Sequence, residues 1–143
     1  MNWHLGEILI QDKYITWDQL GEALEEQKQD KALIGEILVR KGFLSRQLLY
    51  RALAKKGSLR FIDPFHIRIN PKAIERIPRS IAEKYSLLPV DIQQDVLFIA
   101  IGDPLQKWPE QEIKQMAKVQ EIRKVLCLPE DIRQLIRDEY GGV

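Results

Sequence analysis

The first 56 residues contain the same pattern twice, at a constant offset of 29 residues. The two copies cover residues 4–27 and 33–56, and residues 28–32 separate them. Glycine, glutamate and leucine recur at matching places, for example Gly6 with Gly35. Self-similarity at a fixed period is typical of one supersecondary unit that is used twice.

Each copy predicts a helix, a turn and a second helix, because its apolar residues recur at helical spacing. In the first copy, Thr16 and Gln19 form a capping-box pattern, in which each side chain bonds the other's backbone N–H. In the second copy, Ser45 is the N-cap candidate, and Gly42 stands where a helix C-terminus favours a left-handed residue. Two hairpins stacked together bury a core that neither buries alone. Residues 1–58 therefore predict a four-helix tandem-repeat subdomain.

The glycines that recur near the predicted helix starts suggest a specific role. Glycine inside a helix costs up to about 1 kcal/mol relative to alanine, yet Gly6 and Gly35 occupy the same place in both copies. Two roles remain open: close packing of helix on helix, or close approach of an anionic ligand to backbone N–H groups. The first copy has Lys13 at the position of Gly42, so its turn is less well specified.

The rest of the chain, residues 59–143, predicts a small α+β subdomain with a short sheet and flanking helices on one face. Period-two alternation and turn residues predict the strands: residues 61–64, 87–92, 96–101 and 122–128, with a hairpin turn at 93–95. The alternating stretch 65–69 suits a strand or extended chain. Prolines in first turns and helical spacing predict the helices: a short one from Asn70–Pro71, a turn of helix around residue 81, then 109–118 and 129–140.

The repeat resembles a known family. Two units opening Leu5-Gly6-x-x-Leu9 and Ile34-Gly35-x-x-Leu38, with a five-residue spacer, are similar to the N-terminal domain of type II secretion and type IV pilus assembly ATPases. In the MshE-type members this domain carries a tandem cyclic di-GMP-binding motif. This sequence has His4 and Leu33 where the family motif has arginine. The resemblance continues in the same order through residues 61–64, 77–85, 88–90, 98–104 and 132–140.

The resemblance implies a non-catalytic regulatory or docking domain, either part of such an ATPase or a stand-alone homologue. Its implied partner is the cytoplasmic part of an inner-membrane platform protein, which places the chain in the cytoplasm, peripheral to that membrane. It also implies cyclic di-GMP as a regulatory ligand rather than a cofactor, lying along both copies with its phosphates near Gly6 and Gly35. The motif positions that carry over are Leu5, Gly6, Leu9, Leu20, Leu24, Gln27, Gly35, Leu38, Gly42, Leu49 and Leu53.

The charges divide between the copies. Residues 1–27 hold one Lys or Arg against six Asp or Glu, whereas residues 28–60 hold nine against two. One interpretation is that the two charged surfaces attract each other or are simply solvated. The other is that the basic block binds a phosphate ligand or an acidic partner, which would make the chain a generic adaptor. The block consists of Arg40, Lys41, Arg46, Arg51, Lys55, Lys56 and Arg60.

Several classes of function lack their sequence signatures. The phosphate loop and the dinucleotide-binding glycine fingerprint are absent, so we expect no enzyme in this chain. A single cysteine, Cys127, and two histidines without a nearby carboxylate pair predict no metal site. No nucleic-acid-binding motif occurs. No apolar run approaches the roughly 20 residues that span a bilayer, so we expect no direct membrane insertion.

Overall fold

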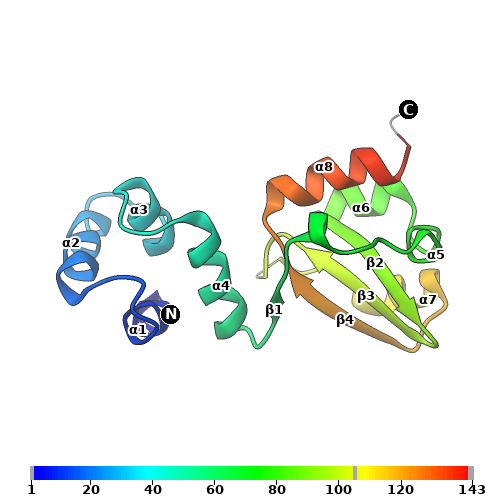
Figure 1. Cartoon of the computed structure of the whole chain (residues 1–143), viewed down its shortest axis with the longest axis horizontal. Coiled ribbons are helices and arrows are strands. Elements are labelled where there is room, and N and C mark those ends of the chain that lie inside the picture. Colours follow the sequence, from blue (N-terminus) through cyan, green and yellow to red (C-terminus); the bar gives the residue numbers. More distant parts are fainter. Residues whose placement is uncertain (1, 105, 142–143) are drawn as a thin grey trace. The chain divides into compact units, whose positions relative to one another are not determined.

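The structure, a computed structural model, describes residues 2–104 and 106–141, and the side chains from Leu5 onward. The chain divides into two compact units, Met1–Ser58 and Leu59–Val143. Each unit is described by itself, and Figure 1 shows the helices of the first and the sheet of the second.

The first unit consists of two helical hairpins that pack reciprocally. Its helices are α1 (Asn2–Gln11), α2 (Trp17–Gln27), α3 (Ile34–Arg40) and α4 (Arg46–Lys56). The first helix of each copy packs against the second helix of the other copy, since α1 contacts α4 and α2 contacts α3 (Figure 1). The two copies are thus related like the halves of a symmetric dimer, in which each contact occurs twice.

The predicted caps form. Thr16 and Gln19 make both bonds of the capping box, at 2.9 and 3.1 Å. The Ser45 hydroxyl accepts a bond from the N–H of Leu48 at 3.2 Å, as an N-cap residue does. These bonds fix where α2 and α4 begin.

The turns inside the two hairpins have the same geometry despite their different residues. Gly42 has a φ of 81° and Lys13 a φ of 63°, both in the left-handed region. The Tyr14 N–H bonds the Leu9 carbonyl at 2.9 Å, and the Phe43 N–H bonds the Leu38 carbonyl at 3.0 Å. This is the six-to-one bond of the Schellman motif. Lys13 adopts a conformation that is costly for a residue with a Cβ atom, because the motif satisfies the carbonyls at the end of α1.

Equivalent positions of the two copies build one core. Both members of several pairs of buried residues 29 positions apart belong to this core: Leu5 and Ile34, Leu9 and Leu38, Ile15 and Leu44, Leu20 and Leu49, and Ala23 and Ala52. The internal repeat is therefore a packing unit, as its apolar spacing predicts.

The second unit is built on a four-stranded mixed sheet of order β1-β4-β3-β2. Its strands are β1 (Arg60–Phe61), β2 (Leu87–Gln93), β3 (Val96–Ile101) and β4 (Glu121–Leu126). Strand β4 is parallel to both β1 and β3, and β2 is antiparallel to β3. The hairpin between β2 and β3 turns at residues 94–95, where Gln94 has a φ of 55°. The helices are α5 (Pro71–Ile74), α6 (Arg79–Tyr85), α7 (Glu110–Ala117) and α8 (Pro129–Glu139).

Helices α6 and α8 pack against each other and against β2 (Figure 1). The Tyr140 hydroxyl at the end of α8 donates to the Ile77 carbonyl before α6, at 2.8 Å. A helix layer on one face of the sheet does not explain the burial of β3, however. The successive residues Ile99 and Ala100 are both fully buried, and successive residues of a strand point to opposite faces. Both faces of this strand are covered, which corrects the expectation of helices on one face.

The structure corrects the prediction for residues 61–69. The strand β1 ends at Phe61, and Pro64–His66 forms a 3-10 helix, η1, instead of an extended stretch. The cause is local: the Asp63 side chain accepts a bond from the N–H of Phe65 at 3.0 Å. Pro64 then supplies a φ suited to a first helical residue.

Candidate functional site

The motif positions in the helical repeat divide into a buried set and an accessible set. The apolar side chains of α1, α3 and the starts of α2 and α4 are core residues: Leu5, Leu9, Leu20, Leu38 and Leu49. Gly6 and Gly35 are buried as well. The positions that retain exposure lie near the ends of the second helices and in one turn. They are Leu24, which is 39% exposed, the half-buried Gln27 and Leu53, and the exposed Gly42.

The two recurring glycines make room for two recurring leucines. A Cβ atom on Gly6 would lie 3.1 Å from a methyl carbon of Leu20, and one on Gly35 would lie 2.6 Å from a methyl carbon of Leu49. Each glycine therefore lets the second helix of its own copy pack closely on the first. Of the two roles left open by the sequence, this geometry supports close packing of helix on helix for both glycines.

Of the two glycines expected near helix starts, only Gly35 lies in the first turn of its helix. Gly6 is the fifth residue of α1, and its N–H has a partner within the helix at that depth. Gly35 is the second residue of α3, but it is buried and α3 has only seven residues. The two positions therefore do not present equivalent N–H groups to an anion. The side chain of His4, which begins the first motif, lies outside the described side chains.

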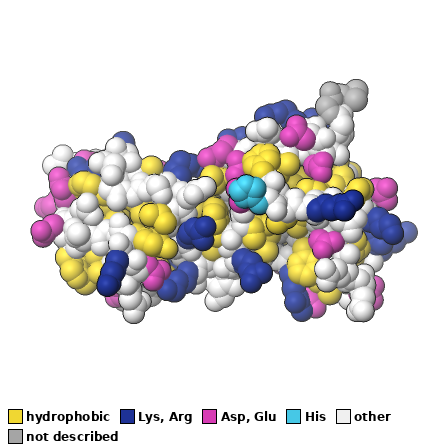
Figure 2. Space-filling view, viewed as in Figure 1, with side chains coloured by type: hydrophobic (Ala, Val, Ile, Leu, Met, Phe, Trp, Pro, Cys, Tyr) yellow, Lys and Arg dark blue, Asp and Glu magenta, His cyan; other side chains and the backbone are white. Residues whose placement is uncertain are grey.

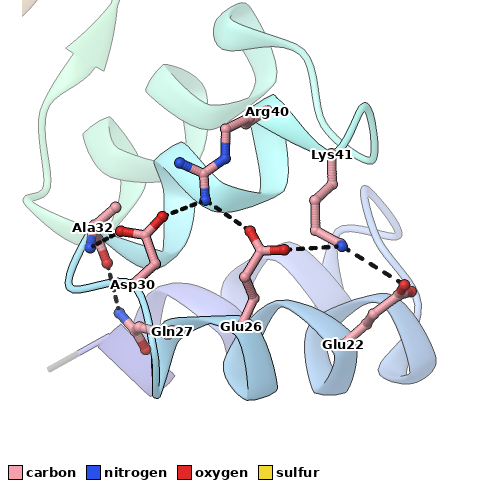
Figure 3. Close-up of polar contacts among 7 residues, drawn as sticks. All are labelled: Glu22, Glu26, Gln27, Asp30, Ala32, Arg40 and Lys41. Carbon is pink, nitrogen blue, oxygen red and sulfur yellow. Dashed lines mark hydrogen bonds and ion pairs between the residues drawn. The ribbon is translucent and has the colours of Figure 1, made fainter.

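Gln27 has a structural partner. Its Nε2 donates to the carbonyl of Ala32 at 3.2 Å, which ties the end of α2 to the spacer between the copies (Figure 3). The Asp30 carboxylate accepts a bond from the Ala32 N–H at 3.1 Å. Ala32, the last residue of the spacer, is therefore held by side-chain bonds at both its carbonyl and its N–H.

An ion pair between the copies occurs twice with its charges reversed. Lys55 lies 3.0 Å from Asp12, and Lys41 lies 3.3 Å from Glu26. Asp12 and Lys41 are equivalent positions of the repeat, and so are Glu26 and Lys55, because each pair is 29 residues apart. The first copy supplies both acids and the second supplies both bases. The unequal charge of the two copies thus serves, at these positions, to attract one copy to the other.

Arg40 adds a second set of contacts at the same interface. Its guanidinium lies 2.7 Å from Glu26 and 2.7 Å from Asp30, while Lys41 bridges Glu26 and Glu22 (Figure 3). Hydrogen bonds from Arg40 and then Lys41 lower the pKa of Glu26, and a bond from Arg40 lowers the pKa of Asp30. Of the basic block, Arg40, Lys41 and Lys55 are thus engaged with acidic residues of the helical unit.

Two exposed features were not singled out by the sequence. Trp17 is 69% exposed at the start of α2, and one turn later no described side chain other than those of its chain neighbours lies within 4 Å of where a Cβ atom on Gly21 would be. Figure 2 shows hydrophobic side chains lying at the surface among charged ones. A comparison of the two copies could have found both features, because Trp17 and Gly21 differ in type from Arg46 and Tyr50 at the equivalent positions of the second copy.

The described residues contain few groups suited to other chemistry. Burial raises the pKa of the Cys127 thiol to about 12, so this thiol is no nucleophile in the folded chain. Within residues 2–104 and 106–141, no three His, Cys, Asp or Glu side chains gather to hold a metal ion. In the same range, no helix has the length and apolar content to cross a bilayer.

A family model matches residues 58–142, which is the second unit, and it describes the MshEN domain. The helical repeat lies before the matched range. The residues that match the family model and the residues of the repeat are therefore different parts of the chain.

Curated relatives align with nearly all of the chain. It is 36% identical over 95% of its length to the type IV pilus assembly ATPase PilB of Thermus thermophilus. It is 29% identical over 99% of its length to PilB of Myxococcus xanthus. The chain spans only 15% and 25%, respectively, of these two relatives.

A solved structure of MshE with cyclic di-GMP has a similar fold. The TM-score is 0.80 at 25% sequence identity, and the match covers 95% of this chain and 98% of that one. Both the helical repeat and the α+β unit are therefore included in the likeness.

Proposed function

This chain belongs to the MshEN domain family, and from that premise we propose that it acts as a non-catalytic docking domain of a type IV pilus or type II secretion assembly ATPase. The observation that carries the proposal is the alignment with PilB over 95% and 99% of this chain, although the chain spans only a small part of each PilB. The chain thus corresponds to one module of a longer ATPase, and its sequence contains no phosphate loop.

The proposed partner is the cytoplasmic domain of an inner-membrane platform protein of the same assembly system. Through this partner, the chain would be held in the cytoplasm at the membrane surface. One feature of the helical unit supports a protein partner: the side chain of Trp17 is 69% exposed. Exposed aromatic side chains are enriched where proteins bind one another.

Calorimetry tests the docking proposal. The platform protein's cytoplasmic domain is titrated into the whole chain, and an unrelated cytoplasmic domain of matched charge is the control. We expect saturable one-to-one binding to the platform domain alone. Absence of heat at high micromolar concentrations, or equal binding to both domains, would reject docking as the function.

Cyclic di-GMP is a second candidate ligand, and the likeness to MshE with cyclic di-GMP favours it. We propose that the dinucleotide would contact the accessible members of the motif rather than the buried ones. These are Leu24, Gln27, Gly42 and Leu53. The remaining motif residues would support the site through packing: Leu5, Gly6, Leu9, Leu20, Gly35, Leu38 and Leu49.

Titration with cyclic di-GMP separates this candidate from docking alone. If the ligand binds, Leu24→Asp should abolish the heat, because a new carboxylate would repel the phosphates. Gln111→Asp, an exposed change in α7 of the second unit, is the matched control and should leave binding unchanged. No heat from the wild-type chain at high micromolar ligand would remove the dinucleotide and leave docking untouched.

A further inference from the structure

The repeat allows the exposed sides of α2 and α4 to be compared position by position. Trp17, Gly21 and Leu24 follow one another at helical spacing, so they lie on one side of α2. The equivalent positions of α4 are Arg46, Tyr50 and Leu53.

In the second copy this side of the helix is covered by its own residues. The guanidinium carbon of Arg46 lies 5.5 Å from the centre of the Tyr50 ring, within cation–π distance. Leu53 beneath them is half-buried against the core. The ring of Tyr50 thus fills the middle of this face.

In the first copy the middle position is empty. Apart from the chain neighbours of Gly21 and the nearby backbone of α2, no described atom lies within 4 Å of the place that a Cβ atom on Gly21 would take. Trp17 is 69% exposed on one side of this gap and Leu24 is 39% exposed on the other. We call Trp17, Gly21 and Leu24 the α2 slot. It lacks the ring that its counterpart contains.

The empty position has a cost that the fold does not recover. Glycine inside a helix is about 1 kcal/mol less favourable than alanine. At Gly6 and Gly35 this cost allows a leucine to pack closely, but Gly21 has no such neighbour. Contiguous apolar side chains at a protein surface mark interaction sites, and Trp17 and Leu24 lie exposed on either side of this open position.

The charges beside the slot select the occupant. Between Trp17 and Gln27, α2 carries four carboxylates and no basic residue. Glu22 and Glu26 face Lys41, whereas Asp18 and Glu25 lie on the solvent side of the helix, and Glu25 pairs with Lys28. Three of these four carboxylates thus pair with basic residues of the chain itself, and the carboxylate of Asp18, next to Trp17, favours a basic residue on the partner.

We propose that the α2 slot receives an aromatic side chain from a basic segment of a protein partner, which supplies the ring that Tyr50 supplies in the second copy. The inference rests on the proposed docking function and assigns its contact surface. The partner's ring would stack on Trp17 and cover Gly21, and a basic residue beside that ring would face Asp18.

The substitution Gly21→Tyr tests the slot because it builds in the missing ring. The helix tolerates it, since Gly21 is an exposed helical position with open space beside it, so the variant should be at least as stable as wild type. Its affinity for the platform protein's cytoplasmic domain should fall about tenfold or more, as for the loss of a buried aromatic contact. Trp17→Ala should reduce binding similarly. Gln111→Tyr in α7 is the matched control and should bind normally.

A second probe tests the slot without the platform protein. The probe is a synthetic amphipathic peptide of lysine and phenylalanine, compared with the same peptide in which alanine replaces phenylalanine. Only the first should shift the Trp17 indole resonance of the wild-type chain, and neither should shift it in the Gly21→Tyr variant.

The outcomes separate the two proposals. If the platform domain binds Gly21→Tyr as tightly as wild type, docking stands and the slot is wrong. If the platform domain does not bind but the phenylalanine peptide does, the slot stands and the docking function is wrong. If neither peptide shifts Trp17, or if cyclic di-GMP does so instead, the assignment of a basic aromatic protein segment is overturned.

Discussion

The side chain of Leu49 fills the space that Gly35 leaves open: a Cβ atom on Gly35 would come within 2.6 Å of its Cδ1. Leu49 is buried in the core of the helical unit and cannot move aside freely. We predict that Gly35→Ala destabilises the unit by about 1–3 kcal/mol through overpacking. Chemical denaturation measures the change.

Substitutions at two other glycines provide comparisons for this prediction. Gly6→Ala should cost less, because its Cβ would meet Leu20 at 3.1 Å instead of 2.6 Å. Gly21→Ala meets nothing and should stabilise the helix by about 0.4–1 kcal/mol. If Gly35→Ala is as stable as Gly21→Ala, the packing role of these glycines is wrong.

The reversed ion pairs between the copies predict a measurable coupling. Asp12 and Lys55 are 3.0 Å apart at a partly exposed interface. A double-mutant cycle of Asp12→Asn and Lys55→Gln should give a coupling free energy of about 0.2–1 kcal/mol. The coupling should shrink at high salt because exposed charges are screened. A cycle that gives zero at low salt would show that this pair does not hold the copies together.

Arg40 predicts a pH dependence of stability. Its hydrogen bonds lower the folded-state pKa of Glu26 and Asp30 from their ordinary values of 4.5 and 3.8. Stability from these bonds is therefore fully present above pH 4.5 and is lost as the pH falls through the lowered folded pKa values. Arg40→Met should remove this component, so its free energy of unfolding should fall less steeply in acid.

The acid titration contains its own control. Asp91 in β2 also has a lowered pKa, mainly through a bond from Asn70 at 3.1 Å. That component should remain in Arg40→Met, so the variant keeps a reduced slope rather than none. An acid slope equal to that of wild type would contradict the assignment to Arg40.

Cys127 predicts a difference between folded and unfolded chains. Burial raises its pKa to about 12, so the folded chain should contain almost no thiolate at neutral pH. A thiol reagent should modify the native chain only at the rate of unfolding and the denatured chain at once. Rapid labelling of the native chain, compared with a Cys127→Ser blank, would show that this thiol is accessible.

Features that depend on neighbouring residues were predictable from the sequence. The caps at Thr16 and Ser45 use bonds that span only three residues, and the Schellman turn at Gly42 follows from a glycine after an apolar run. The turn at Lys13 was harder to predict, because lysine rarely adopts a left-handed φ. Only the equivalent residue of the second copy, Gly42, indicated it.

Features that depend on distant residues were not predictable in the same way. The glycine spacing showed that Gly6 and Gly35 have a common role, but it did not identify Leu20 and Leu49 as the residues above them. Likewise, the charge totals of the copies suggested attraction, but only packing brings Lys41 to Glu26. The 3-10 helix at Pro64–His66 was missed because one Asp63 bond outweighs an alternating pattern.

The most direct test of docking through the α2 slot is a titration of the platform protein's cytoplasmic domain into the wild-type chain and into Gly21→Tyr. We predict saturable binding to wild type and binding weakened about tenfold or more in the variant, which keeps its stability. Absence of binding to wild type, or equal affinity for both, would contradict it.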